Sequence, residues 1–480
     1  MFRPALILGV ASLANVATGI ALLALTPWFL STEAYADFAV LSALGLFCAV
    51  AGYEWVRVTI LRFGGFHESE KAQRYLEGAK CAYLLATVGL TATAISAPVL
   101  GVPLLKACVV AAIAISQGVF EGLQAYSRAN GRVLRFAIAS VLRLLLQVII
   151  VVATAYFSRD GTITAAGQAS ATLFSLLVSY ANLIGRFPFK LKKRDLIEIL
   201  TFGVPIAASS IFASALPSAI RMMLVIVFPP ALAAGYILAV DVGQRVLGAL
   251  GMALNVAVLQ GAIVAAHSGD AVGASRRHCG VIIIVLAPMA ATLLMAEPVV
   301  RTWLLPSAYQ VGYQEMIGAA ILAGLILAVR TFGVDAAFLI AEQPRGSYVG
   351  SLVCLAVTIL IAGSLTTNGL GSLAVNVSLV AGSAAGILAS ALVLHSRNVS
   401  LFPLMYIFKL ASGLFAMAAV MAIASFSTPI LRIALTPLAV FLFLLITYRA
   451  NLWSFSYFSH EISAKQPSLP NRFTSDSLDD

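Results

Sequence analysis

Charged and amide side chains recur at helical spacing inside stretches of this chain that are otherwise apolar. Gln117, Glu121, Gln124 and Arg128 stand at i, i+4, i+7 and i+11, which would align them along one face of a helix. In hydrocarbon a charge costs about 2.5–3.5 kcal/mol even on lenient insertion scales, so such residues usually face a bundle interior or a water-filled cavity. The pattern therefore indicates a polar pathway between apolar helices, where a hydrophilic cargo or an ion would be bound.

Two acid–base pairs lie within single helical turns, Glu54 with Arg57 at i+3 and Asp241 with Arg245 at i+4. Each pair has two interpretations. It is either an ion pair that only fixes helix packing, or a gate that opens when a cargo competes for the arginine. The carboxylates predicted to gate the pathway or to couple an ion are Glu54, Glu121, Asp241 and Asp335.

Three further arginines, Arg143, Arg221 and Arg330, lie deep in apolar stretches, and no carboxylate stands three or four positions from any of them. Arginine suits phosphate because its planar fork donates two hydrogen bonds and stays charged when desolvated. A cationic pathway favours a cargo that carries phosphate or acidic sugars, whereas an exporter of cationic drugs is expected to have carboxylates in excess. The predicted substrate pathway comprises Arg57, Arg143, Arg221, Arg245 and Arg330.

The elements that must position these residues are membrane-spanning helices. The chain has 480 residues, of which 61% are hydrophobic and 10% are charged, and its mean hydropathy is +0.98. Soluble domains are about half apolar and a quarter charged. The apolar runs match the roughly 20 residues that cross a bilayer as a helix, rather than the ten-residue alternating segments of an outer-membrane barrel. The predicted fold class is an all-α polytopic membrane protein.

Apolar windows predict fourteen spans, and no gap between them is long enough for an inserted soluble domain. The first, which runs from Pro4 to Leu25 at its most apolar, is too long for a signal-peptide core and is expected to be retained. The predicted spans are 5–27, 36–58, 79–98, 104–127, 134–157, 164–185, 199–228, 231–259, 280–297, 313–338, 347–365, 370–394, 404–425 and 428–448.

The net charge of +10 is explained by the basic loops of a membrane protein rather than by nucleic-acid binding. Alternate connections are basic, and an even number of spans then places both termini in the cytoplasm. Arg62, at the end of the second span, is most simply an orientation anchor. The basic connections carry Arg62, Lys71, Arg74 and Lys80, then Arg128, Arg132 and Arg135, then RFPFKLKKR at 186–194, then Arg276 and Arg277, Arg345 and Arg397.

The chain also repeats weakly, since PWFLSTEAYADFAV at 27–40 and FPPALAAGYILAV at 228–240 each end one span and begin the next. Two repeated halves around a central pathway are a transporter design. The predicted division is a six-helix lobe at 1–185, a basic cytoplasmic linker at 186–198, a second six-helix lobe at 199–395, a helix pair at 396–450 and a disordered cytoplasmic tail at 451–480.

This 6 + 6 + 2 plan resembles the polysaccharide-transport branch of the multidrug/oligosaccharidyl-lipid/polysaccharide flippases. The segment GYEWVRVTILRF at the end of the second span resembles the form found in Wzx-type flippases of O-antigen and exopolysaccharide. Where many relatives have Tyr-Gly after the first linker, this chain has Tyr35-Ala36, and in the second half Gly235 precedes Tyr236.

The resemblance implies a flippase that moves undecaprenyl-pyrophosphate-linked oligosaccharide across the bacterial inner membrane by alternating access. It implies lipid-linked oligosaccharide and membrane lipids as partners, with a polysaccharide polymerase and a chain-length regulator as candidate protein partners. No enzymatic activity, cofactor, metal or nucleic acid is expected, and the absence of a Walker A sequence argues against ATP hydrolysis.

Three alternatives stay open. A multidrug-type exporter shares the fold, and only the cationic pathway argues against it. A lipid II flippase shares both fold and cargo chemistry. A polymerase, ligase or glycosyltransferase of the same route would need catalytic residues on a large outer loop, and the longest outward connection, near 298–312, has no acidic pair or histidine group suited to such work.

Overall fold

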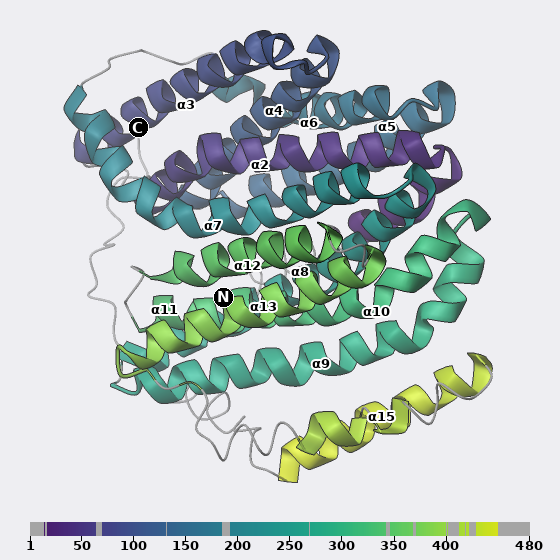
Figure 1. Ribbon diagram of the computed structural model, residues 1–480. Helices are drawn as coiled ribbons and strands as arrows, with labels where there is room; N and C mark the ends of the chain where they lie inside the picture. The colour runs from purple at the N-terminus through teal and green to yellow at the C-terminus, as the bar shows by residue number, and fades with distance from the viewer. Residues whose placement is uncertain are drawn as a thin grey trace.

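The computed structural model describes residues 14, 17–63, 70–130, 132–184, 193–267, 269–341, 346–367, 371–399, 401, 412–417, 419–421 and 429–449, and in these ranges the chain is helical and without strands (Figure 1). The elements are η1 (Thr26–Trp28), α2 (Thr32–Phe63), α3 (Glu70–Ser96), η2 (Ala97–Leu100), α4 (Leu104–Ala129), α5 (Val133–Ser158), α6 (Gly161–Ile184), α7 (Lys193–Val227), α8 (Pro230–His267), α9 (Ala271–Leu304), α10 (Ser307–Val329), η3 (Arg330–Val334), α11 (Asp335–Ile340), α12 (Ser347–Thr367), α13 (Gly371–His395) and α15 (Pro429–Arg449).

Eleven of the described helices are long and apolar enough to cross a membrane, and the chain is therefore a multi-pass membrane protein. Three shorter apolar helices lie at Ala17–Trp28, Ser412–Met421 and Leu435–Thr447. The eleven long helices overlap the predicted spans from 36–58 to 370–394 and confirm the all-α polytopic class. The three shorter helices overlap the predicted spans 5–27, 404–425 and 428–448, of which residues 5–13, 404–411 and 422–425 lie outside the described residues. The tail at 451–480 and residues 185–192 of the basic stretch lie outside the described residues.

Short polar residues begin several of the helices by satisfying their free backbone N–H groups. The Ser31 hydroxyl accepts from the Ala34 N–H at the start of α2. At the start of α6 the Asp160 carboxylate accepts from the Ile163 N–H at 2.9 Å. Asp270 caps α9 in the same way.

The helices form two groups that face each other (Figure 1). In the first group α2 packs on α3, α4 and α6, and α5 packs on α6. In the second, α8 packs on α9 and α10, while α13 joins α10 to α12. Helix α7 lies between the groups and packs on both α2 and α12, and α15 lies outside the second group against α9. The division into two six-helix lobes stays a prediction, because α7 contacts both groups.

Helices α8 and α10 approach each other backbone to backbone. A Cβ added at Gly243 would lie 2.4 Å from the carbonyl oxygen of Ala320, and one added at Gly235 would lie 2.7 Å from that of Tyr309. From the α10 side, Gly324 touches the backbone of Gly243 in the same manner. Small residues allow this proximity between membrane helices. We call this contact the glycine seam.

The two ends of the helix bundle differ in charge. The basic end is where α2, α4, α6, α8 and α13 finish and the arginine-rich connections lie. The opposite end carries the connections around residues 26–31, 159–161, 228–230 and 304–306.

Candidate functional site

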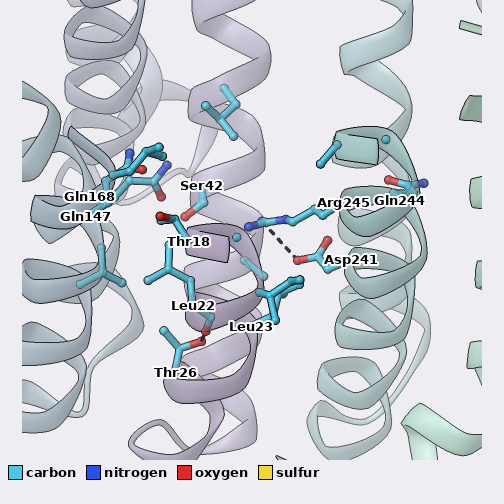
Figure 2. Close-up of a pocket in the computed structure, with 18 of the residues that line it drawn as sticks. Thr18, Leu22, Leu23, Thr26, Ser42, Gln147, Gln168, Asp241, Gln244 and Arg245 are labelled. Carbon is cyan, nitrogen blue, oxygen red and sulfur yellow. Dashed lines mark hydrogen bonds and ion pairs between the residues drawn. The ribbon is translucent and has the colours of Figure 1, made fainter. Parts of the chain in front are cut away.

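A cavity of about 430 Å³ lies between the two groups of helices. The first group contributes the helix Ala17–Trp28, α2, α4, α5 and α6 to its wall, and the second contributes α8 and η3. Figure 2 shows the two sides of the cavity, with Asp241 and Arg245 on one of them. The polar residues of the wall are Thr18, Thr26, Tyr35, Ser42, Gln117, Arg143, Gln147, Gln168, Asp241, Gln244 and Arg245.

Helix α5 presents a polar face to the cavity and an apolar face away from it. Arg143, Gln147 and Val151 line the cavity at i, i+4 and i+8, the spacing that aligns side chains along a helix. Leu145 and Ile149 are exposed on the remaining surface, as expected for residues that face lipid. This amphipathic pattern turns the arginine toward the cavity.

Arg143 has neutral partners. Its guanidinium donates to Oε1 of Gln117 at 3.0 Å and lies 4.8 Å from the centroid of the Phe120 ring. Gln117 in turn donates to the carboxylate of Glu121 at 2.6 Å. The Nε of Arg143 is buried and has no hydrogen-bond partner among the described residues. Arg143 therefore keeps hydrogen-bonding capacity and an unneutralised charge beside the cavity.

Asp241 on α8 is bound by two arginines. Arg221 of α7 donates to one carboxylate oxygen, and Arg245 lies 3.3 Å from the other. The side chains of Arg221 and Asp241 are 7% and 2% exposed, whereas that of Arg245 is 39% exposed and extends into the cavity (Figure 2). Two cations against one anion leave this triad with a net positive charge, and Arg245 presents it to the cavity.

Glu54 and Arg57 form a bidentate ion pair toward the basic end of α2. Both bonds, from Nε and Nη2 of Arg57 to the two carboxylate oxygens of Glu54, are 2.5 Å long. Arg57 also lies 3.9 Å from the carboxylate of Glu121 on α4. Neither member of the pair lines the cavity. Through Glu121 and Gln117, however, a chain of polar contacts connects the pair to Arg143.

Arg330 is enclosed within the second group of helices. Its side chain is 2% exposed and donates to the Gly350 carbonyl and the Ser351 hydroxyl, each at 3.2 Å. Asp335, whose carboxylate accepts from Ser390 at 2.8 Å, lies 3.5 Å from the Nε of Arg330. Residues Arg330–Val334 form a π-helical turn. This turn separates Arg330 from Asp335, which stands five positions later in the chain.

Of the three arginines without a local carboxylate, Arg143 lines the cavity, whereas Arg221 and Arg330 lie outside its wall. That these two also belong to the substrate pathway stays a prediction. Arg221 finds Asp241 on the next helix, and Arg330 finds Asp335 across the π turn. Arg245, assigned from its pair with Asp241, does line the cavity. The transport roles of all these residues stay predictions.

Two hydrogen bonds join the halves of the chain at the opposite end, beside the cavity. The Trp28 indole N–H donates to the carbonyl of Leu304 at 2.9 Å, and the buried Tyr309 hydroxyl donates to the carbonyl of Leu30 at 2.8 Å. The Tyr309 ring meets the ring of Tyr35, which lines the cavity, edge-on at 5.6 Å. We call these contacts the outer latch. Sequence reasoning missed it, because its bonds end on backbone carbonyls almost 280 positions away.

Gln168 of α6 was also missed. It lines the cavity next to Gln147 of α5 (Figure 2). The available signal was a single amide inside the sixth apolar window, and no charged residue stands three or four positions from it.

No protein-family model and no curated protein matches the sequence. Solved structures do match. A structure described as the lipid II flippase MurJ in an inward closed conformation has a TM-score of 0.69 at 12% identity, covering 94% of this chain and 100% of that chain.

Two multidrug resistance MATE family transporters of the MOP superfamily are also similar. The inward-facing one has a TM-score of 0.57 at 15% identity, with 81% of this chain and 95% of that chain covered. The outward-facing one has a TM-score of 0.59 at 15% identity, with coverages of 82% and 95%. The chain therefore has the fold that is common to the MurJ flippase and the MATE transporters of the MOP superfamily.

Proposed function

We propose that this chain is a flippase that moves undecaprenyl-pyrophosphate-linked oligosaccharide repeat units from the cytoplasmic to the periplasmic leaflet, for O-antigen or exopolysaccharide synthesis. The observation that carries the proposal is that Arg143 and Arg245 line one cavity from opposite groups of helices. A pyrophosphate between them would be contacted by a guanidinium group on each side, and this group matches phosphate oxygens with paired, charge-assisted hydrogen bonds. The polyprenyl tail stays in the lipid throughout.

Access to the cavity alternates when the two lobes, 1–185 and 199–395, rock against each other, as in transporters built from repeated halves. Loading takes place from the basic end. There the headgroup first meets Arg57, which lies between Glu54 and Glu121, and then passes along the polar chain to Arg143. Release takes place at the opposite end, after the outer latch has broken.

The proposed location is the bacterial inner membrane, with both termini in the cytoplasm. The basic end then faces the cytoplasm, because cytoplasmic connections of membrane proteins carry the excess of lysine and arginine. The polymerase and the chain-length regulator of the polysaccharide are the proposed protein partners.

A multidrug exporter is the second candidate, since the MATE transporters have the same fold. Its cargo would be expected to need an accessible carboxylate. Among the described residues, the carboxylate in the cavity wall is that of Asp241, which already has Arg221 and Arg245 as partners. This arrangement favours an anionic cargo. A third candidate is a lipid II flippase, which is how the similar MurJ structure is described. It would bind a pyrophosphate in the same way, but its loss would affect peptidoglycan rather than surface polysaccharide.

The test is complementation of a deletion strain of the source bacterium with Arg143→Ala and Arg245→Ala. Both variants are expected to insert at the normal level, to abolish surface polysaccharide and to accumulate the lipid-linked repeat unit. Arg132→Ala, which removes an exposed arginine outside the cavity, is the matched control and should restore the polysaccharide. Normal export by both cavity variants would contradict the cationic-cavity mechanism.

The deletion strain itself separates the alternatives. Full surface polysaccharide together with new sensitivity to dyes or drugs would favour the exporter. Arrested peptidoglycan synthesis with accumulated lipid II would favour the lipid II flippase.

A further inference from the structure

Two glutamines line the cavity on the same side as Arg143. Gln147 lies one helical turn beyond Arg143 on α5, and Gln168 lies on α6, which packs against α5. Residues four positions apart on a helix have their Cβ atoms about 6 Å from each other. The amides therefore lie next to the place where Arg143 would hold a phosphate, displaced toward the opposite end of the bundle.

The two amides retain hydrogen-bonding capacity. Gln147 donates to the Thr172 hydroxyl at 3.4 Å, and that hydroxyl donates to the backbone carbonyl of Gln168 at 3.1 Å. Thr172 thereby holds Gln147 beside α6. The amide oxygen of Gln147 and the whole amide of Gln168 have no further partner among the described residues. Both side chains are half-buried in a wall whose shape is set by rigid helices.

The neighbouring groups are uncharged as well. Figure 2 shows Thr18 and Ser42 between the two glutamines and Arg245. Ser42 is 3% exposed, and its hydroxyl makes no hydrogen bond with any described residue. This side of the cavity thus combines amide and hydroxyl groups that keep unused hydrogen-bonding capacity, and such groups donate and accept hydrogen bonds without charge.

We propose, on the basis of the function proposed above, that Gln147 and Gln168 form a glycan subsite that recognises the sugar attached directly to the phosphate. Amide side chains offer a donor pair and an acceptor to hydroxyl or acetamido groups, while the charge of the phosphate is left to Arg143. The cavity volume of about 430 Å³ is near the lower end of the roughly 300–1,000 Å³ of ligand pockets. Recognition in this conformation therefore concerns the phosphate-proximal sugar rather than the whole repeat unit.

The experiment compares ligands that differ only in the sugar. Purified full-length protein in nanodiscs is titrated with inorganic phosphate, glucose 1-phosphate, galactose 1-phosphate and N-acetylglucosamine 1-phosphate, and binding is followed by phosphorus NMR. For the wild type, at least one sugar phosphate is expected to bind more tightly than inorganic phosphate. The ratio of the two dissociation constants is the affinity contributed by the sugar.

Gln147→Met and Gln168→Met are each expected to reduce that ratio about three- to tenfold, the loss that corresponds to one hydrogen bond, without changing the affinity for inorganic phosphate. Arg143→Met should weaken the binding of inorganic phosphate and leave the ratio of the two dissociation constants unchanged. Gln124→Met is the matched control, because Gln124 bonds to Ser140 between α4 and α5 outside the cavity wall, and it should change neither quantity. Elution as a single size-exclusion peak establishes that each variant is folded.

The subsite is overturned if the wild type shows no preference for any of these sugar phosphates, or if neither glutamine variant changes the ratio. The subsite is also overturned if the glutamine variants weaken the binding of inorganic phosphate as much as the binding of the sugar phosphate. If the glutamine variants behave as expected while Arg143→Met leaves phosphate binding unchanged, the subsite is supported and the phosphate-binding role of Arg143 in the proposed function fails. The two proposals are therefore tested separately.

Discussion

The buried triad of Arg221, Asp241 and Arg245 makes a quantitative prediction about folding. In Asp241→Ala the guanidinium of Arg221, 7% exposed, stays buried without a counter-charge. Breaking a buried pair in this way costs about 3–5 kcal/mol. Arg245→Ala removes a side chain that is 39% exposed, and pairs with such a partly solvated partner are worth about 0.2–1 kcal/mol. The loss of folding free energy caused by Asp241→Ala should therefore be at least three times that caused by Arg245→Ala.

The assay is the temperature at which half of the detergent-purified protein loses its monodisperse size-exclusion peak. A double variant, Arg221→Met with Asp241→Leu, removes both buried charges and should recover most of the loss, since apolar replacement of a buried ion pair is often neutral or stabilising. Equal destabilisation by Asp241→Ala and Arg245→Ala would refute the reasoning. So would a double variant that is less stable than Asp241→Ala alone.

Two other predictions concern the ends of the pathway. The double variant Trp28→Phe with Tyr309→Phe removes both hydrogen bonds of the outer latch, each worth about 1 kcal/mol. It should speed the labelling of a cysteine introduced in the cavity wall, Leu22→Cys, by a membrane-impermeant thiol reagent added from the opposite end. An unchanged labelling rate would mean that the latch does not limit access to the cavity. Exchanging Glu54 and Arg57 keeps the i,i+3 ion pair but places a carboxylate next to Glu121 of α4. The protein should therefore insert normally and lose polysaccharide export, whereas retained export would show that the pair only stabilises the helix packing.

The eleven membrane-length helices of the described residues were predictable from the sequence because a long apolar stretch is a strong physical signal. A stretch of about 20 apolar residues has one stable solution in a bilayer, a helix whose backbone bonds are satisfied internally. Single proline residues also mark helix starts, as Pro103 and Pro306 do at the N-caps of α4 and α10. The prediction needed no knowledge of which helices touch.

The candidate site was predictable only where partners share a helix. The ion pairs of Glu54 with Arg57 and of Asp241 with Arg245 follow from positions three or four apart. The contact between Arg221 and Asp241 depends on how α7 and α8 cross, and this is a property of packing rather than of spacing. The outer latch depends on packing between segments almost 280 positions apart.

Arg330 and Asp335 share one helical stretch, yet five positions separate them. The spacing rule assumes 3.6 residues per turn, and the π turn at Arg330–Val334 departs from it. Single π turns are rare in α-helices, and nothing in the local composition RTFGV distinguishes this one. A rule built on the regular helix excludes such a pair.

The glycine seam packs α8 and α10 closely against each other. At Gly235 and Gly243 the two backbones are in contact and no side chain separates them, so we expect the two helices to move together. Tyr309 of the outer latch is carried by α10, and Arg245 of the cavity is carried by α8. A tilt that pulls Tyr309 away from Leu30 therefore also draws Arg245 back from the cavity. In the proposed transport cycle, opening of the opposite end and release of the cargo would then take place in the same movement.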